Sequence, residues 1–166
     1  MPHVVSLALQ EWVHDLNLSG CKKITNVNNL GNIHKLNLDK CCISDVSELG
    51  NVHELILSNT YVHDVSKLMN VHTLNLDKCY CISGTSSLYG TRCLSMCDGF
   101  NGVKDIGNLR KLEILEIDKK IYGIHFLKNL TSLKIKQFDG DANKINKLKK
   151  INKDVVVTYI KKKWRQ

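Results

Sequence analysis

One phrase of about 20 residues recurs along this chain and restricts its possible folds more than any other feature. Each copy holds two aliphatic residues separated by a polar one, as in Leu36-Asn37-Leu38, with Ile33 before the pair and Cys41 after it. The leading aliphatics are Leu16, Leu36, Leu55, Leu74, Leu94, Leu115, Leu133 and Val155, spaced by 20, 19, 19, 20, 21, 18 and 22 residues. A period of this length is typical of a solenoid of stacked units.

The aliphatic pairs predict the strands of one parallel sheet. Side chains alternate along a strand, so Leu36 and Leu38 point to the same side, and stacked copies share a continuous apolar face. The return segments carry aliphatics three residues apart, as at Val46, Leu49 and Val52, a spacing that suits a 3₁₀ turn. With 19 or 20 residues per coil, we expect no room for a long helix opposite the sheet.

These copies resemble the leucine-rich repeat, L-x-x-L-x-L-x-x-N/C-x-L, over about residues 13 to 160. The resemblance implies an α/β, right-handed solenoid of seven to eight repeats, with a parallel sheet on one face and short turns or 3₁₀ segments on the other. The phrase is also similar to short-repeat proteins of large DNA viruses and to the substrate-reading part of F-box proteins. Only about a dozen residues precede the first copy, so the helical module of many F-box proteins is not matched and a ligase role is not expected.

Length and charge favour one domain with an uneven charge distribution. We expect a cap over residues 1–12, repeats over 13–152, and a terminal edge strand with a basic tail over 153–166. Residues 1–103 hold 7 Lys and Arg against 9 Asp and Glu, whereas 104–166 hold 17 against 7. We find no signal peptide or membrane span in the sequence, and the seven cysteines are odd in number. These features predict a cytoplasmic protein with reduced thiols.

Equivalent positions of stacked copies form columns, and the first unusual column is rich in histidine. Its members are His14, His34, His53 and His72, continued by Arg92 and Glu113. Imidazoles about 5 Å apart on adjacent strands would resist simultaneous protonation. A straight column does not surround a metal ion, so no metal is expected. Simple duplication of the repeat with its histidine is the favoured explanation, and a pH-dependent or metal-binding role is the alternative.

Two further columns follow the strands. Cys21, Cys41, Thr60 and Cys79 occupy the position where the repeat family uses Asn or Cys to bond the backbone of the bend, which predicts an internal ladder. The next position holds Lys22, Cys42, Tyr61, Tyr80, Phe100 and Ile121. Exposed aromatic residues there would favour a protein interface, whereas rings that stack along the bend would be structural.

The open face of the sheet is predicted to be polar, with mixed charge. Its central column is Asn17, Asn37, Ile56, Asn75, Ser95, Glu116 and Lys134, in which Ile56 is an apolar centre. Such a face suits a protein partner better than a polyanion, although a plain solvated face is the alternative. We therefore predict a non-enzymatic protein-interaction module that needs no cofactor. The partner-binding residues we expect are His34, Lys35, Asn37, His53, Glu54, Ile56, Tyr61, His72, Asn75, Tyr80 and Phe100.

Catalytic motifs do not support another class of function. The sequence has no Gly-rich phosphate loop, paired metal-binding histidine motif or nucleophile elbow, so no catalytic residue is predicted. Two alternatives stay open: polyanion binding through the C-terminal lysines, and a self-assembling structural protein. Without a nucleic-acid-binding motif, nucleic acid is not the expected partner. The resemblance to viral proteins implies a host or virion protein as the partner. We expect the chain itself to be a monomer or a weak dimer.

Overall fold

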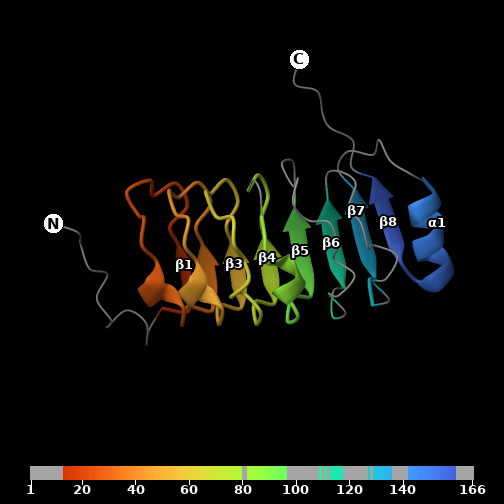
Figure 1. The fold of residues 1–166 in the computed structure, drawn as a ribbon, viewed down its shortest axis with the longest axis horizontal. Helices are drawn as coiled ribbons and strands as arrows, with labels where there is room; N and C mark the ends of the chain where they lie inside the picture. The colour runs from red at the N-terminus through yellow and green to blue at the C-terminus, as the bar shows by residue number, and fades with distance from the viewer. Residues whose placement is uncertain are drawn as a thin grey trace, which may run out of the picture.

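The strands of this protein form one parallel sheet in chain order. The computed structural model describes residues 13–79, 82–96, 109, 111, 113–117, 127, 129–135 and 142–159. Among them, each strand pairs with the next along the chain, in an eight-stranded sheet. The strands are β1 (Asp15–Asn17), β2 (Lys35–Asn37), β3 (Glu54–Ile56), β4 (Thr73–Asn75), β5 (Cys93–Met96), β6 (Ile114–Ile117), β7 (Ser132–Ile135) and β8 (Val156–Tyr159). Figure 1 shows them side by side along the long axis. The predicted solenoid is confirmed.

The strand register confirms seven of the eight predicted leading aliphatics. Leu16, Leu36, Leu55, Leu74, Leu94, Leu115 and Leu133 pair in succession. The eighth assignment was wrong, because Leu133 pairs with Val157 rather than with Val155. The last return contains a helix, α1 (Ala142–Ile151), which lies beside β8 at the end of the sheet (Figure 1). The extra length of this return accommodates a helix that we did not expect.

The core lies between the sheet and the return segments. In the interior coils both aliphatics of a pair are buried, as Leu55 and Leu57 show with 0% exposure, whereas Leu16 and Leu18 of the first coil are half-buried. The returns include the predicted 3₁₀ turns η2 (Asn28–Leu30), η3 (Ser47–Leu49) and η4 (Thr85–Ser87). Each fully buried leucine contributes about 1.5–3 kcal/mol of burial free energy, so the repeated pairs account for the stacking. In the part of the chain described, no helix is long and apolar enough to cross a bilayer.

The bend that leaves each of the first four strands requires a left-handed backbone. This conformation falls at one position of the repeat, four residues after the leading leucine. The φ values are 77° at Gly20, 58° at Lys40, 55° at Asn59 and 58° at Lys78. Glycine and asparagine adopt this region readily, whereas a lysine there costs about 1–2 kcal/mol. The bend geometry is therefore kept even where the sequence does not favour it.

Candidate functional site

The sheet face of β2, β3 and β4 gathers five of the predicted partner-binding residues. The register sets Lys35 beside Glu54, and it sets Ile56 between Asn37 and Asn75. All five side chains are half-exposed. Lys35 Nζ lies 3.1 Å from Glu54 Oε1, with side chains 44% and 38% exposed. A surface ion pair of this kind is worth about 0–1 kcal/mol, so both groups can exchange it for a partner's charges.

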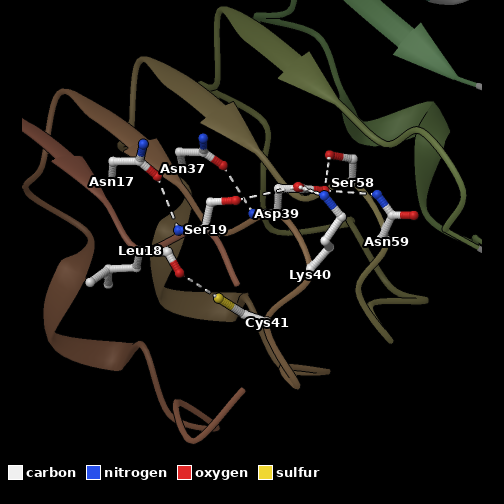
Figure 2. Close-up of polar contacts among 9 residues, drawn as sticks. All are labelled: Asn17, Leu18, Ser19, Asn37, Asp39, Lys40, Cys41, Ser58 and Asn59. Carbon is white, nitrogen blue, oxygen red and sulfur yellow. Dashed lines mark hydrogen bonds and ion pairs between the residues drawn. The ribbon is translucent and has the colours of Figure 1, made fainter. Parts of the chain in front are cut away.

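The asparagines of the central column have a structural role that the sequence analysis missed. Each side-chain oxygen accepts a hydrogen bond from the backbone N–H two residues later, which closes the bend. The pairs are Asn17 with Ser19 at 3.0 Å, Asn37 with Asp39 at 3.0 Å, and Asn75 with Asp77 at 2.9 Å. Figure 2 shows the first two. Ile56 occupies the same column without an acceptor, so it departs from the pattern in hydrogen bonding as well as in polarity.

Asp39 is a hydrogen-bonding centre at the end of this face (Figure 2). Its carboxylate accepts hydrogen bonds from Ser58 Oγ at 2.8 Å and Asn59 Nδ2 at 2.7 Å, and Lys40 Nζ lies 3.0 Å away. Ser19 Oγ of the preceding coil donates a further bond, of 3.3 Å. Partial burial raises the pKa of Asp39, but the bonds from Asn59, Lys40 and Ser58 outweigh it and hold the pKa at about 2. Asp39 is therefore a permanent negative charge that links three coils.

The four histidines form a stack of imidazole rings. Ring centroids are 4.2 Å apart between His14 and His34, 4.5 Å between His34 and His53, and 4.6 Å between His53 and His72. His14 Nδ1 lies 2.6 Å from Asp15 Oδ1. The Nδ1 atoms of His34 and His53 are buried and have no hydrogen-bond partner. The predicted column is thus a continuous stack with two unsatisfied nitrogens.

The surroundings favour uncharged imidazoles at His34 and His72. Burial lowers the pKa of His34, and the neighbouring His14 and His53 lower it further. Burial also lowers the pKa of His72, and His53 and Arg92 act in the same direction. Ligand atoms of His14, Asp15 and His34 lie within 4.8 Å of one another. Stacked rings direct their nitrogen lone pairs side by side rather than towards one point, so this geometry does not support a metal assignment.

The cysteine column is an internal ladder at Cys41, Thr60 and Cys79, as predicted, whereas Cys21 is exposed. Cys41 Sγ donates to the Leu18 carbonyl at 3.1 Å (Figure 2), and Cys79 Sγ donates to the Leu57 carbonyl at 3.0 Å. Thr60 Oγ1 donates to the same Leu57 carbonyl at 2.6 Å. Burial raises the pKa of the Cys41 and Cys79 thiols, so both stay protonated at neutral pH. A protonated, hydrogen-bonded thiol is a poor nucleophile, which makes these cysteines part of the scaffold.

The aromatic column is represented by one described tyrosine. Tyr61 is 71% exposed, and its backbone N–H donates to the Ile43 carbonyl at 3.0 Å. Tyr80 and Phe100, the other predicted aromatic contacts, lie outside the described residues. The backbone of Tyr61 is therefore held by a hydrogen bond while its ring is exposed to solvent, an arrangement that suits an interface residue.

The second half of the sheet face is more apolar than the sequence analysis expected. The row of Lys35, Glu54 and Thr73 continues through Cys93, Ile114, Ser132 and Val156. Ile114 is 37% exposed and Val156 is 62% exposed. Ile114 directly before Leu115 and Val156 directly before Val157 are the sequence signal for these exposed aliphatics.

The fold defined by these features is the leucine-rich repeat solenoid. No protein-family model matches the sequence, and no curated protein matches it. Solved structures do match. An internalin (inlF) of Listeria monocytogenes has a TM-score of 0.67 at 22% identity, covering 96% of this chain and 52% of the internalin. Internalin C2 (inlC2) of the same species has a TM-score of 0.68 at 19% identity, covering 96% and 78%.

A third solved structure, a leucine-rich repeat protein of Leptospira interrogans, has a TM-score of 0.57 at 21% identity, covering 78% of this chain and 38% of that one. The chain thus spans about half the length of the first internalin and less of the Leptospira protein. The TM-scores establish a shared fold, and at identities this low the matches establish the fold alone. They transfer no activity or partner to this chain.

Proposed function

We propose that this chain is a non-enzymatic module that recognises a protein through the sheet face of β2, β3 and β4. The contact residues of this proposal are His34, Lys35, Asn37, His53, Glu54, Ile56, Tyr61, His72, Asn75, Tyr80 and Phe100. The observation that carries it is Ile56, an apolar side chain that interrupts a column of asparagines.

Ile56 is unfavourable for the isolated repeat. The asparagine at this position closes the bend with a hydrogen bond of 2.9–3.0 Å in the neighbouring coils, and such a bond contributes about 0.5–1.5 kcal/mol. Ile56 forgoes that bond and leaves its side chain half-exposed in the middle of a polar face. A feature that lowers stability and exposes apolar surface is expected where a partner buries it.

The residues around Ile56 support a partner with an apolar anchor and charges of both signs. Lys35 and Glu54 offer one group of each sign, and Asp39 stays ionised throughout the physiological range. The amide groups of Asn37 and Asn75 flank Ile56 on either side. Apolar centres within polar rims are typical of protein interfaces, whereas polyanion sites are predominantly basic.

The substitution Ile56→Asn tests the proposal because it restores the asparagine of the neighbouring coils. We expect it to leave the melting temperature unchanged or slightly raised and to weaken partner binding at least tenfold, a hot-spot effect of about 1.4 kcal/mol or more. The native chain and Ile56→Asn would serve as matched baits at moderate salt. The captured protein would then be purified for a direct affinity measurement. Met69→Gln, which alters an exposed side chain outside the strands, is the control and should bind normally.

The C-terminal lysines support polyanion binding as a second candidate. Lys147, Lys149 and Lys150 are exposed on α1 and line a shallow groove with Asn143 and Asn146. Binding through these groups would weaken steeply with added salt, since each phosphate contact releases counterions. Affinity for a single-stranded polynucleotide that is lost in Lys149→Gln/Lys150→Gln but kept in Ile56→Asn would favour this candidate. Self-association would instead appear as a concentration-dependent mass in light scattering.

The cellular setting belongs to the proposal as well. We expect a cytoplasmic location from the lack of a signal peptide or membrane span in the sequence, and a host or virion partner from the resemblance to short-repeat viral proteins. Identification of the protein captured by the native chain, and not by Ile56→Asn, would test both predictions.

A further inference from the structure

We propose that the histidine stack is sensitive to protonation. At neutral pH it supports the backbone hydrogen bonds at the N-terminal ends of β1 to β4, and it weakens them as the pH falls towards 5.5. This inference concerns the free protein and does not depend on a partner. It rests on ring spacing, buried nitrogens and the backbone bonds at the same positions.

Ring spacing is the first argument. Successive centroids are 4.2, 4.5 and 4.6 Å apart, with interplanar angles of 25°, 11° and 14°. Neutral imidazoles pack well in this arrangement, but two imidazolium ions at such distances repel each other. Histidine is also the side chain whose charge changes between about pH 5 and pH 8. The observed spacing of the rings is therefore favourable only while most of the rings are neutral.

The buried nitrogens give the second argument. Nδ1 of His34 and Nδ1 of His53 have no hydrogen-bond partner. A neutral ring can carry its proton on Nε2 and leave Nδ1 as a lone pair. A charged ring must carry a proton on both nitrogens, so Nδ1 would become a buried donor without an acceptor. Protonation thus adds an unsatisfied polar group in the middle of the stack.

Charged groups lie beside several rings of the stack. His14 Nδ1 lies 2.6 Å from Asp15 Oδ1 at the exposed end. Within the stack, Glu54 favours and Lys35 opposes the charged form of His34. Glu113 and Glu54 favour the charged form of His72, and Arg92 opposes it. Both carboxylates are ion-paired: Lys35 Nζ lies 3.1 Å from Glu54, and Arg92 Nη1 lies 3.3 Å from Glu113. These pairs reduce the electrostatic effect of the carboxylates on the histidines.

The sign of the effect follows from these contributions. His34 and His72 have lowered pKa values in the folded chain, so the unfolded chain binds more protons as the pH falls below about 6.5. Their contribution to stability is complete above that pH and is lost below it.

The backbone links the stack to the sheet. The carbonyls of His14, His34 and His53 accept hydrogen bonds from the amides of Lys35, Glu54 and Thr73, at 3.0, 2.9 and 3.0 Å. Repulsion between the rings therefore acts on the first bonds between successive strands. Ser132 makes the same bond, of 3.1 Å, to the carbonyl of Glu113, where the column holds no histidine. That bond provides an internal control.

The test compares acid sensitivity in the native chain and in variants that keep a ring but cannot titrate. Melting temperatures would be measured at pH 7.5 and pH 5.5 for the native chain, His34→Phe and His53→Phe, with His34→Gln as a second variant should phenylalanine perturb the fold. We expect the native chain to lose about 3 °C or more beyond the loss in His34→Phe or His53→Phe. His63→Gln, an exposed histidine outside the stack, should behave like the native chain.

Hydrogen exchange provides the local readout. Between pH 7.5 and pH 5.5, after correction for intrinsic rates, exchange of the Lys35, Glu54 and Thr73 amides should rise about threefold to tenfold, while that of Ser132 stays level. Equal losses of melting temperature in the native chain and the phenylalanine variants would overturn the proposal. Equal rises in exchange at Glu54 and Ser132 would overturn it as well.

Discussion

The first four coils and the last four solve the same stacking problem in different ways. From β1 to β4, the strands have three residues each, and the bends are closed by repeated side-chain bonds of Asn37, Asp39 and their equivalents. From β5 to β8, the strands have four residues each, and the last return contains α1. Ladders of equivalent side chains therefore join the bends of the first half, and in the described part of the second half the strands are longer and a helix follows β7.

This difference follows from how ladders work. A side chain can repeat its bond to the next coil only when that coil carries a suitable residue at the same position. Asp39 needs the hydroxyl of Ser58, and Asp77 needs that of Ser95, each at 2.8 Å. Where the repeat becomes irregular, apolar packing takes over, as with Ile145 and Leu148 of α1, which are 7% and 0% exposed. Side-chain hydrogen bonds thus organise the surface of the first half, and Ile56 is an apolar exception on that surface.

The largest expected effect separates interior coils from the terminal coil. Leu55→Ala removes a side chain that is 0% exposed and contacts coils on both sides, so we expect a loss of about 2–5 kcal/mol in the free energy of unfolding. Val157→Ala, at the equivalent position of the half-buried last strand, should cost less than about 1.5 kcal/mol. Urea titrations of both variants measure the difference. Equal losses would contradict the picture of nearest-neighbour stacking.

A smaller effect tests the polar ladder of the first half through pH. The pKa of Asp39 is about 2, below the ordinary aspartate value of 3.8, so its stabilising contribution is present above about pH 4 and is lost as the pH falls towards 2. We expect Asp39→Asn to cost on the order of 1–2 kcal/mol at pH 7 and to flatten the dependence of stability on pH between 4 and 2.

The control for the ladder comes from the second region. Asp154→Asn changes an exposed carboxyl near β8 and should alter the acid limb of the stability curve by less than about 0.5 kcal/mol. Chemical denaturation at several pH values compares the two variants. If Asp154→Asn flattened the curve as much as Asp39→Asn, the ladder would not be the source of the acid sensitivity.

The smallest effect concerns the left-handed bends of the first half. Lys78 has a φ of 58°, so Lys78→Gly removes strain, and we expect a gain of about 0.5–1 kcal/mol after the entropy of glycine in the unfolded chain is included. Lys67→Gly, at an exposed site where φ is not positive, should instead lower stability. Thermal unfolding distinguishes the two. A loss in both variants would show that bend strain is not limiting.

Much of the fold could be predicted because the strand pattern depends on residues two positions apart. Leu36 and Leu38 signal a strand and its buried face without any knowledge of the neighbouring coils. The cysteine ladder was predictable for a similar reason, since Cys41 and Cys79 recur at one position of the phrase. Local periodicity was enough for these features.

The features that were missed depend on contacts between coils or on geometry within the bend. Val155 begins an aliphatic run, as a strand would, yet Val157 is the residue that pairs with Leu133. The last return contains α1 and is longer than the others. The bonds of Asn37 and Asp39 require the bend conformation to be known. The unsatisfied nitrogen of His34 likewise depends on ring orientation, which the residue column leaves open.

Affinity of the native chain and of Ile56→Asn for the captured partner, measured side by side by calorimetry, tests the central claim most directly. We expect at least a tenfold loss of affinity in Ile56→Asn, with a melting temperature equal to or slightly above that of the native chain. Undiminished affinity in a well-folded Ile56→Asn variant would contradict it, because the face of β2, β3 and β4 would then not be the surface that binds.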